Sequence, residues 1–156
     1  MAQTVVFDTN ILVQAFEKLE SDHQFILLAI TQKKFLLGWD TQGSICKEYE
    51  KNLYRSENYR KWLQKVQQLG QISYVGKSSL PVTHKQFLET HGCHEASDHG
   101  FIGVAFHSGK ILVSEDSDIG KGPKGHQPPH MEALNYLTTK MGLSVYDAKE
   151  ACEHLA

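Results

Sequence analysis

Apolar positions along the chain follow two patterns in regular alternation, short continuous runs and helical repeats. Runs rich in β-branched and aromatic residues predict buried strands at 4–8, 35–39, 72–75, 110–114 and 143–146. Apolar residues spaced by three and four, bounded by capping residues and glycines, predict helices at 10–18, 21–33, 44–54, 57–69, 83–91, 97–108, 131–141 and 148–155. Residues 120–130, rich in Gly, Pro, Lys and His, predict a long loop.

Strands that alternate with helices are joined by crossovers, so the sequence predicts an α/β fold with a mostly parallel sheet of about five strands and helices on both faces. The apolar character of the strand runs fits burial on both faces of the sheet. The chain has 156 residues and no linker-like segment. We therefore expect residues 1–156 to form a single domain.

Composition and charge narrow the function classes. A hydrophobic content of 40% excludes a wholly disordered chain, and no apolar run approaches the ~20 residues of a membrane span. The net charge of −2 argues against a DNA-binding module that relies on basic residues alone. The first residues lack the features of a secretory signal, and three widely spaced cysteines suit a reducing compartment. We expect a cytoplasmic protein that does not bind a membrane.

Acidic residues gather at the predicted strand ends, where ligands bind in open α/β sheets. Asp8 ends the first run, and Asp116 and Asp118 follow the fourth. Glu48 and Asp98 lie on predicted helices. Carboxylates brought together repel one another, and a hard divalent cation such as Mg²⁺ or Mn²⁺ relieves that repulsion. Such a site suits metal-assisted phosphodiester hydrolysis, although each acid also has a structural explanation as a helix cap, a helix-dipole partner or a solvated charge.

Four segments together resemble the motifs of PIN-domain nucleases. They are Val5-Val-Phe-Asp-Thr-Asn-Ile-Leu-Val13, Ser44-Ile-Cys-Lys-Glu-Tyr49, Ser97-Asp-His-Gly-Phe-Ile-Gly-Val-Ala-Phe106 and Ile111-Leu-Val-Ser-Glu-Asp-Ser-Asp-Ile119. The resemblance implies a three-layer α/β/α sandwich and Mg²⁺- or Mn²⁺-dependent cleavage of RNA. Carried over motif by motif, it implies four catalytic acids, Asp8, Glu48, Asp98 and Asp116, of which Asp8, Asp98 and Asp116 hold the metal.

The same resemblance implies supporting roles for three polar residues. Asn10 serves the metal site directly or through a neighbour, Ser114 takes the hydroxyl position two before the last acid, and Asp118 is a candidate fifth acid. Glu115 departs from the simplest pattern, and an extended strand would point its side chain to the face opposite Asp116. RNA is the implied substrate, and an antitoxin-like inhibitory protein and a homodimer are open as further partners.

Two other functions stay open. The segments Asp8-Thr-Asn10 and Asp116-Ser-Asp118 also resemble acidic motifs of haloacid-dehalogenase-like phosphatases, although Asn10 stands where that class has an acid and its lysine motif is not evident. The second alternative is an inactive PIN fold that binds nucleic acid or protein.

Three further groups have both a functional and a structural interpretation. Basic residues of the predicted loop either meet a nucleic-acid backbone or face solvent: Lys121, Lys124, His126 and His130. A second group has metal-capable side chains at spacings that suit tetrahedral zinc poorly: His91, Cys93, His94 and His99. Aromatic residues either stack on bases or fill the core, which helical spacing favours for the last two: Tyr49, Tyr54, Tyr59 and Trp62.

Overall fold

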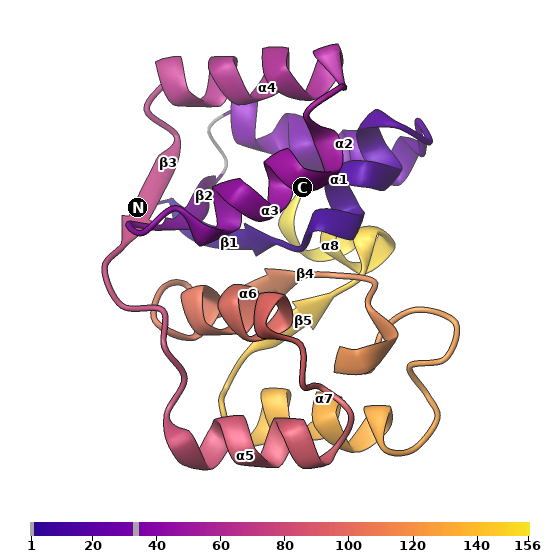
Figure 1. The fold of residues 1–156 in the computed structure, drawn as a ribbon. Helices are drawn as coiled ribbons and strands as arrows, with labels where there is room; N and C mark the ends of the chain where they lie inside the picture. The colour runs from indigo at the N-terminus through magenta and orange to yellow at the C-terminus, as the bar shows by residue number, and fades with distance from the viewer. Residues whose placement is uncertain (1, 33–34) are drawn as a thin grey trace.

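The computed structural model describes residues 2–32 and 35–156 (Figure 1). Within these ranges, five strands form one sheet in the order β3-β2-β1-β4-β5, and every neighbouring pair is parallel. The strands are β1 (Gln3–Phe7), β2 (Phe35–Asp40), β3 (Ile72–Val75), β4 (Ile111–Val113) and β5 (Ser144–Tyr146). The parallel sheet expected from the alternating pattern is confirmed.

Helices cover both faces of this sheet. They are α1 (Thr9–Phe16), α2 (Ser21–Thr31), α3 (Ser44–Leu53), α4 (Glu57–Gln68), α5 (Val82–Thr90), α6 (Ala96–Phe106), α7 (His130–Thr139) and α8 (Ala148–Leu155). In the view of Figure 1, α4 lies above the strands, and α5 and α7 lie below them. Helix α6 packs against β1, β2 and β4, whereas α2 packs against β2 and α8. The expected three-layer α/β/α arrangement is therefore confirmed.

The hydrophobic core lies on both faces of β1, so the C-terminal part of this central strand is apolar. Val5, Val6 and Phe7 are completely buried, as expected of a strand with helices on both faces. Helix α4 places an apolar stripe against the same core, including Tyr59 and Trp62. Each large side chain buried in this way contributes roughly 1.5–3 kcal/mol, so the core supplies a rigid frame for the strand ends.

Element boundaries differ from the sequence prediction at several strand and helix ends. Strand β4 is shorter than predicted because Lys110, at φ 59°, has a left-handed backbone that a strand cannot continue through. Helix α6 begins at Ala96, one residue before the predicted cap, and Glu95 before it is extended. The helix predicted over 21–33 ends at Thr31 as α2, and Lys33 lies outside the described residues.

Two local features determine the surroundings of the sheet edge. A short 3₁₀ helix, η1 (Ser117–Ile119), follows β4 and was not predicted. Gly103 on α6 allows the chain after β3 to pass close, because a Cβ there would lie 1.7 Å from the carbonyl oxygen of Ser78. The long connection between η1 and α7 is irregular, as its composition predicted. No helix in the described ranges is long and apolar enough to cross a membrane.

Candidate metal centre

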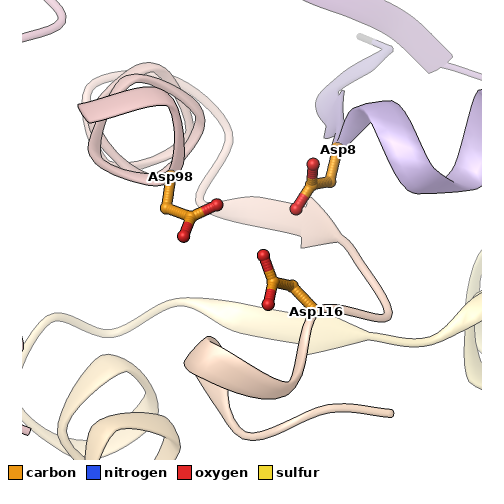
Figure 2. A group of neighbouring side chains, drawn as sticks. All are labelled: Asp8, Asp98 and Asp116. Atoms are coloured by element: carbon orange, nitrogen blue, oxygen red, sulfur yellow. The ribbon is translucent and has the colours of Figure 1, made fainter. Parts of the chain in front are cut away.

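Three aspartates from distant parts of the chain converge at one edge of the sheet (Figure 2). Asp8 directly follows β1, Asp98 lies in the first turn of α6, and Asp116 comes three residues after β4. One carboxylate oxygen of each lies within 4.8 Å of the others. Because β1 and β4 are parallel neighbours, their ends meet at the same edge, and α6 packs against both strands. The fold therefore brings these three predicted residues together.

A buried serine connects two of the three aspartates. The hydroxyl of Ser114 donates to Oδ2 of Asp8 at 2.7 Å and accepts from the backbone N–H of Asp116 at 3.1 Å. The carboxylate of Asp116 also accepts from the backbone N–H of Asp118 at 2.9 Å. Ser114 thus lies where the family resemblance places a hydroxyl, and it fixes the strand end relative to Asp8.

Burial and mutual repulsion raise the pKa values of Asp8 and Asp98. Burial raises the pKa of Asp8 to about 6, the Ser114 hydrogen bond opposes the shift, and the charge of Asp116 adds to it. The pKa of Asp98 rises to about 8 because of burial and the charges of Asp116 and Asp8. Burial and Asp116 also raise the pKa of Asp118. A bound cation would reverse these shifts, because it favours the charged form of each carboxyl.

Helix capping accounts for only part of the cluster. Asp8 occupies the N-cap position of α1, yet its side chain makes no capping hydrogen bond. Asp116 does cap η1, through the backbone N–H of Asp118. Asp98 stands in the first turn of α6, where the helix dipole favours a negative charge. The burial of Asp8 and Asp98, each only 7% exposed, is not needed for either structural role.

The three aspartates line a cleft of about 310 Å³ together with Glu48 and Glu95. In the described part of the chain, this lining contains five carboxylates and no lysine or arginine. Glu48, on α3, is half-buried in the wall and lies outside the group of three. The Thr9 hydroxyl oxygen, also in the lining, is buried and has no hydrogen-bond partner within the described ranges. Carboxylates and a free hydroxyl are the hard oxygen donors that Mg²⁺ and Mn²⁺ prefer, so the residues present fit such an ion.

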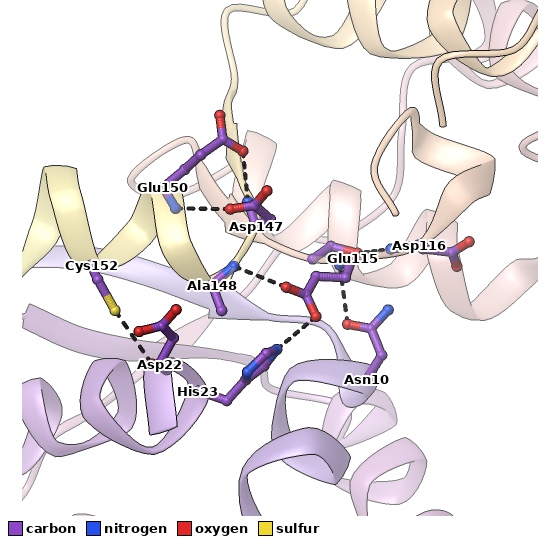
Figure 3. Close-up of polar contacts among 10 residues, drawn as sticks. Asn10, Asp22, His23, Glu115, Asp116, Asp147, Ala148, Glu150 and Cys152 are labelled. Atoms are coloured by element: carbon purple, nitrogen blue, oxygen red, sulfur yellow. Dashed lines mark hydrogen bonds and ion pairs between the residues drawn. The ribbon is translucent and has the colours of Figure 1, made fainter. Parts of the chain in front are cut away.

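Glu115 points away from this cleft, as its position in an extended strand predicted (Figure 3). Its carboxylate contacts Nε2 of His23 at 2.6 Å and accepts from the backbone N–H of Ala148 at 3.2 Å. Its own backbone N–H donates to Oδ1 of Asn10 at 3.2 Å. Asn10 also lines the cleft, so it links the cleft to the Glu115 backbone.

The basic residues of the 120–130 connection differ in their exposure and in their ion pairs. The Lys121 ammonium forms an ion pair with Glu150 at 2.8 Å, while Lys124 and His126 are exposed. His130 begins α7, and its Nδ1 lies 3.9 Å from Oδ1 of Asp118. A role in nucleic-acid binding stays a prediction for all four, with Lys124 and His126 the most accessible.

In the histidine and cysteine group near α6, His91, Cys93 and His99 make contacts within the fold, whereas His94 is exposed. His99 contacts the backbone oxygen of Cys93 at 2.7 Å, and His91 contacts the Phe87 backbone oxygen at 2.8 Å and Glu132 at 3.0 Å. Within the described ranges, the side chains placed to share a metal are Asp8, Asp98 and Asp116. The zinc interpretation therefore has no support in the geometry.

The aromatic residues divide as their spacing suggests. Tyr49 and Tyr59 are fully buried and Trp62 nearly so, whereas Tyr54 is 53% exposed. The Tyr49 hydroxyl donates to the backbone oxygen of Phe7, which lies directly before Asp8. Tyr49, Tyr59 and Trp62 belong to the core, and Tyr54 alone of the four is free to meet a base.

Two polar residues that the sequence did not single out are Thr9, which lines the cleft, and Asp40, which caps the helix that carries Glu48. Thr9 lies between two of the predicted site residues, and a threonine at a helix start gives no signal beyond capping. Asp40 is buried at the end of β2, and its carboxylate accepts from the backbone N–H groups of Ser44 and Ile45 at 3.0 Å each, which caps α3. An acid shortly before the start of a predicted helix is the signal that indicates such a cap.

Comparison with known protein families identifies one that this chain matches over most of its length. The family model described as PIN domain matches residues 4–118, a range that includes Asp8, Glu48, Asp98 and Asp116. No curated protein matches the chain. Among solved structures, the crystal structure of VapBC2 from Rickettsia felis bound to a DNA fragment from their promoter is similar, with 12% identity, a TM-score of 0.47, and coverage of 92% of this chain and 98% of that chain.

Proposed function

Because the chain belongs to the PIN domain family, we propose that it is an endoribonuclease that hydrolyses phosphodiester bonds with Mg²⁺ or Mn²⁺ held by Asp8, Asp98 and Asp116. The observation that carries this proposal is the convergence of three aspartates, of which Asp8 and Asp98 are buried and have raised pKa values. Such a cluster destabilises the metal-free fold unless a cation or protons offset its charge, and perturbed groups of this kind mark functional sites.

The protein's own residues supply the positioning. When bound, the cation withdraws electron density from the phosphate and acidifies a nearby water. Ser114 holds the carboxylate of Asp8 in place, and the backbone N–H of Asp118 holds that of Asp116. We assign to Glu48, on the cleft wall outside the group of three, the task of orienting the attacking water and accepting its proton.

The charge of the cleft makes a cation necessary for substrate approach as well as for chemistry. Five carboxylates line it, so a phosphodiester is repelled until positive charge is present. Removal of the metal should therefore weaken RNA binding as well as stop cleavage. An antitoxin-like inhibitory protein and a homodimer are partner hypotheses that follow from the family resemblance alone.

The proposed domain covers the whole chain, 1–156. The family match ends at residue 118, yet β5 pairs with β4 in the same sheet, and α8 packs against α2. The segment beyond the match therefore completes the sandwich that carries the cleft.

The experiment is cleavage of a labelled single-stranded oligoribonucleotide by the wild-type protein and by Asp8→Asn. We expect cleavage with Mn²⁺ and none with EDTA. The cleavage rate of Asp8→Asn should be lower by at least about 100-fold, because removing one carboxylate weakens metal binding and changes the charge of the site. The variant should keep its circular dichroism spectrum and its Tm, since it relieves repulsion. Metal-independent cleavage, or an Asp8→Asn protein as active as the wild type, would contradict the proposal.

The two alternatives predict different outcomes in the same assay. A phosphatase would release phosphate from a monoester and leave the internal diester intact, but the described cleft lining lacks the lysine that this class uses. An inactive binding module would bind the oligoribonucleotide without cleaving it at any metal concentration.

A further inference from the structure

A glycine in the middle of α6 leaves open space beside the cleft. A Cβ built at Gly100 meets no heavy atom within 4 Å, although the residue lies inside an eleven-residue helix. Glycine within a helix costs about 1 kcal/mol relative to alanine, and no neighbour in the described part of the chain is close enough to exclude a side chain here. The contrast is Gly103, one turn further on, where the backbone of Ser78 fills the space. A glycine with open space beside it allows a bound molecule to approach the backbone closely.

Gly100 lies between two hollows that continue from the acidic cleft. A slot of about 180 Å³ lies between the N-terminal turns of α3 and α6, and it shares Glu48, Ser97 and Phe101 with the cleft. A second hollow of about 230 Å³ on the other side of α6 shares Ala96 and Gly100 with the slot. The three therefore form one path that leads from the aspartates across the first turns of α6.

The lining along this path changes from acidic to apolar and then to basic. Glu48 lines the slot where it joins the cleft, and the apolar walls beyond it are Ile45, Phe101 and the bare backbone at Gly100, which suit the flat face of a nucleobase. The far hollow offers Ser78, Ser79 and the exposed Lys85. Hydroxyl groups and a lysine bind phosphate. Among the described residues, the lining of this hollow contains no carboxylate, so a phosphate meets less repulsion here than in the cleft.

We propose that the slot over Gly100 binds the base next to the scissile phosphate of a single-stranded RNA, and that Lys85 meets the following phosphate. This inference rests on the proposed nuclease function and deepens it. A paired helix cannot present one base to a slot between two protein helices, so the substrate class is a single strand or an unpaired loop.

The test fills the slot without disturbing the fold or the metal. Gly100→Leu places a side chain in the space, and Gly76→Leu is its matched control, because a Cβ at Gly76 also meets nothing within 4 Å and that residue lines none of the three hollows. Both changes are made in the Asp8→Asn background, which prevents cleavage. Binding of a labelled ten-nucleotide single-stranded RNA is followed by fluorescence anisotropy at a Mn²⁺ concentration that calorimetry shows to saturate the Asp8→Asn protein, because this background binds the metal more weakly.

We expect Gly100→Leu to raise the Kd about tenfold, the effect of losing one stacked base, and Gly76→Leu to change it by less than twofold. Gly100→Ala is the second variant: it should raise the Tm by about 2–4 °C through helix propensity while weakening RNA binding. Equal Kd values for the Gly100→Leu and Gly76→Leu proteins would overturn the proposal, as would an RNA duplex that binds as tightly as the single strand.

Separate measurements keep the two proposals distinguishable. Calorimetric titration of Mn²⁺ into the Gly100→Leu protein with Asp8 intact should match the wild type, because the slot lies outside the three aspartates. If the metal binds and RNA is cleaved but Gly100→Leu has no effect, only the slot is wrong. If the wild type neither binds Mn²⁺ nor cleaves RNA, the nuclease proposal itself fails.

Discussion

Glu115 and Asp116 are neighbours in the sequence with opposite surroundings. Glu115 is satisfied by His23 and the backbone of Ala148, and the His23 hydrogen bond lowers its pKa despite partial burial. Asp116 turns to the other side, where Asp8 and Asp98 gather with raised pKa values. The two side chains diverge because successive residues of an extended chain point to opposite faces.

The comparison separates a structural acid from candidate functional ones by chemistry. The Glu115 contacts join the strand end to α2 and α8, so its charge stabilises the fold. The three aspartates oppose one another, so their charge destabilises the fold until a cation is present. Side chains that lower the stability of their own fold are expected at functional sites.

The largest expected effect is on catalysis. Asp116→Asn should reduce the single-turnover rate of RNA cleavage at saturating Mn²⁺ by at least about 100-fold, whereas Glu115→Gln should retain most of it. The reason is that Asp116 lines the cleft, whereas Glu115 does not and its carboxylate contacts His23 instead. An inactive Glu115→Gln beside an active Asp116→Asn would mean that the metal ligands have been assigned to the wrong face.

The next effect is the pH dependence of stability in the metal-free protein. The pKa of Asp98 rises from 3.8 to about 8 on folding, so the folded state holds a proton that the unfolded state releases between these values. Its contribution to stability is therefore fully present below about pH 4 and is lost as pH rises toward 8, by an amount on the order of a few kcal/mol.

Asp98→Asn removes this dependence and serves as the reference. In EDTA, we expect the variant to be more stable than the wild type at pH 9, with a difference that shrinks toward pH 5, measured by urea unfolding. With Mn²⁺ added, the order at high pH should reverse, because the wild type gains more from binding. A difference that does not change with pH would show that the acids do not interact as described.

A smaller effect should appear at the structural acid. Glu115→Gln keeps an acceptor for Ala148 but loses the charge that faces His23, and we expect it to reduce the free energy of unfolding by about 2 kcal/mol at pH 7. Since the pKa of Glu115 is lowered, this contribution should fade as pH falls below its usual range. His23→Gln offers the matched test from the other partner, and an unchanged stability in both variants would remove the structural role.

The smallest effect is expected at Asp118, which stands beside the cluster without joining the group of three. Its backbone N–H supports Asp116, and this contact survives a side-chain change. Asp118→Asn should therefore cost about tenfold in rate, or ~1.4 kcal/mol, under the same conditions as Asp116→Asn. A loss as large as that of Asp116→Asn would place Asp118 among the metal ligands.

Much of the fold could be predicted from the sequence, because parallel strands buried on both faces are apolar throughout and easy to recognise. The meeting of Asp8 and Asp116 followed from strand ends that share one edge, and Asp98 from its place beside an apolar stripe. The opposite directions of Glu115 and Asp116 followed from strand geometry alone. Their roles as metal ligands stay predictions.

Other features depend on contacts that a sequence pattern does not contain. The helix η1 forms because Asp116 accepts from the N–H of Asp118, which an extended reading of that segment misses. The ion pair that occupies Lys121 involves Glu150, far along the chain. The slot over Gly100 exists because no described side chain packs against that part of α6. The spacing of apolar residues in the sequence does not reveal such open space.

The most direct measurement is a crystal structure of the protein soaked in Mn²⁺, with the anomalous signal of manganese used to locate the ion. We expect a peak between the carboxylates of Asp8, Asp98 and Asp116, and its absence from crystals of the Asp98→Asn variant treated in the same way. A fully soaked wild-type crystal with no peak at these carboxylates, or with manganese bound only at Glu115 and His23, would contradict the proposed metal centre.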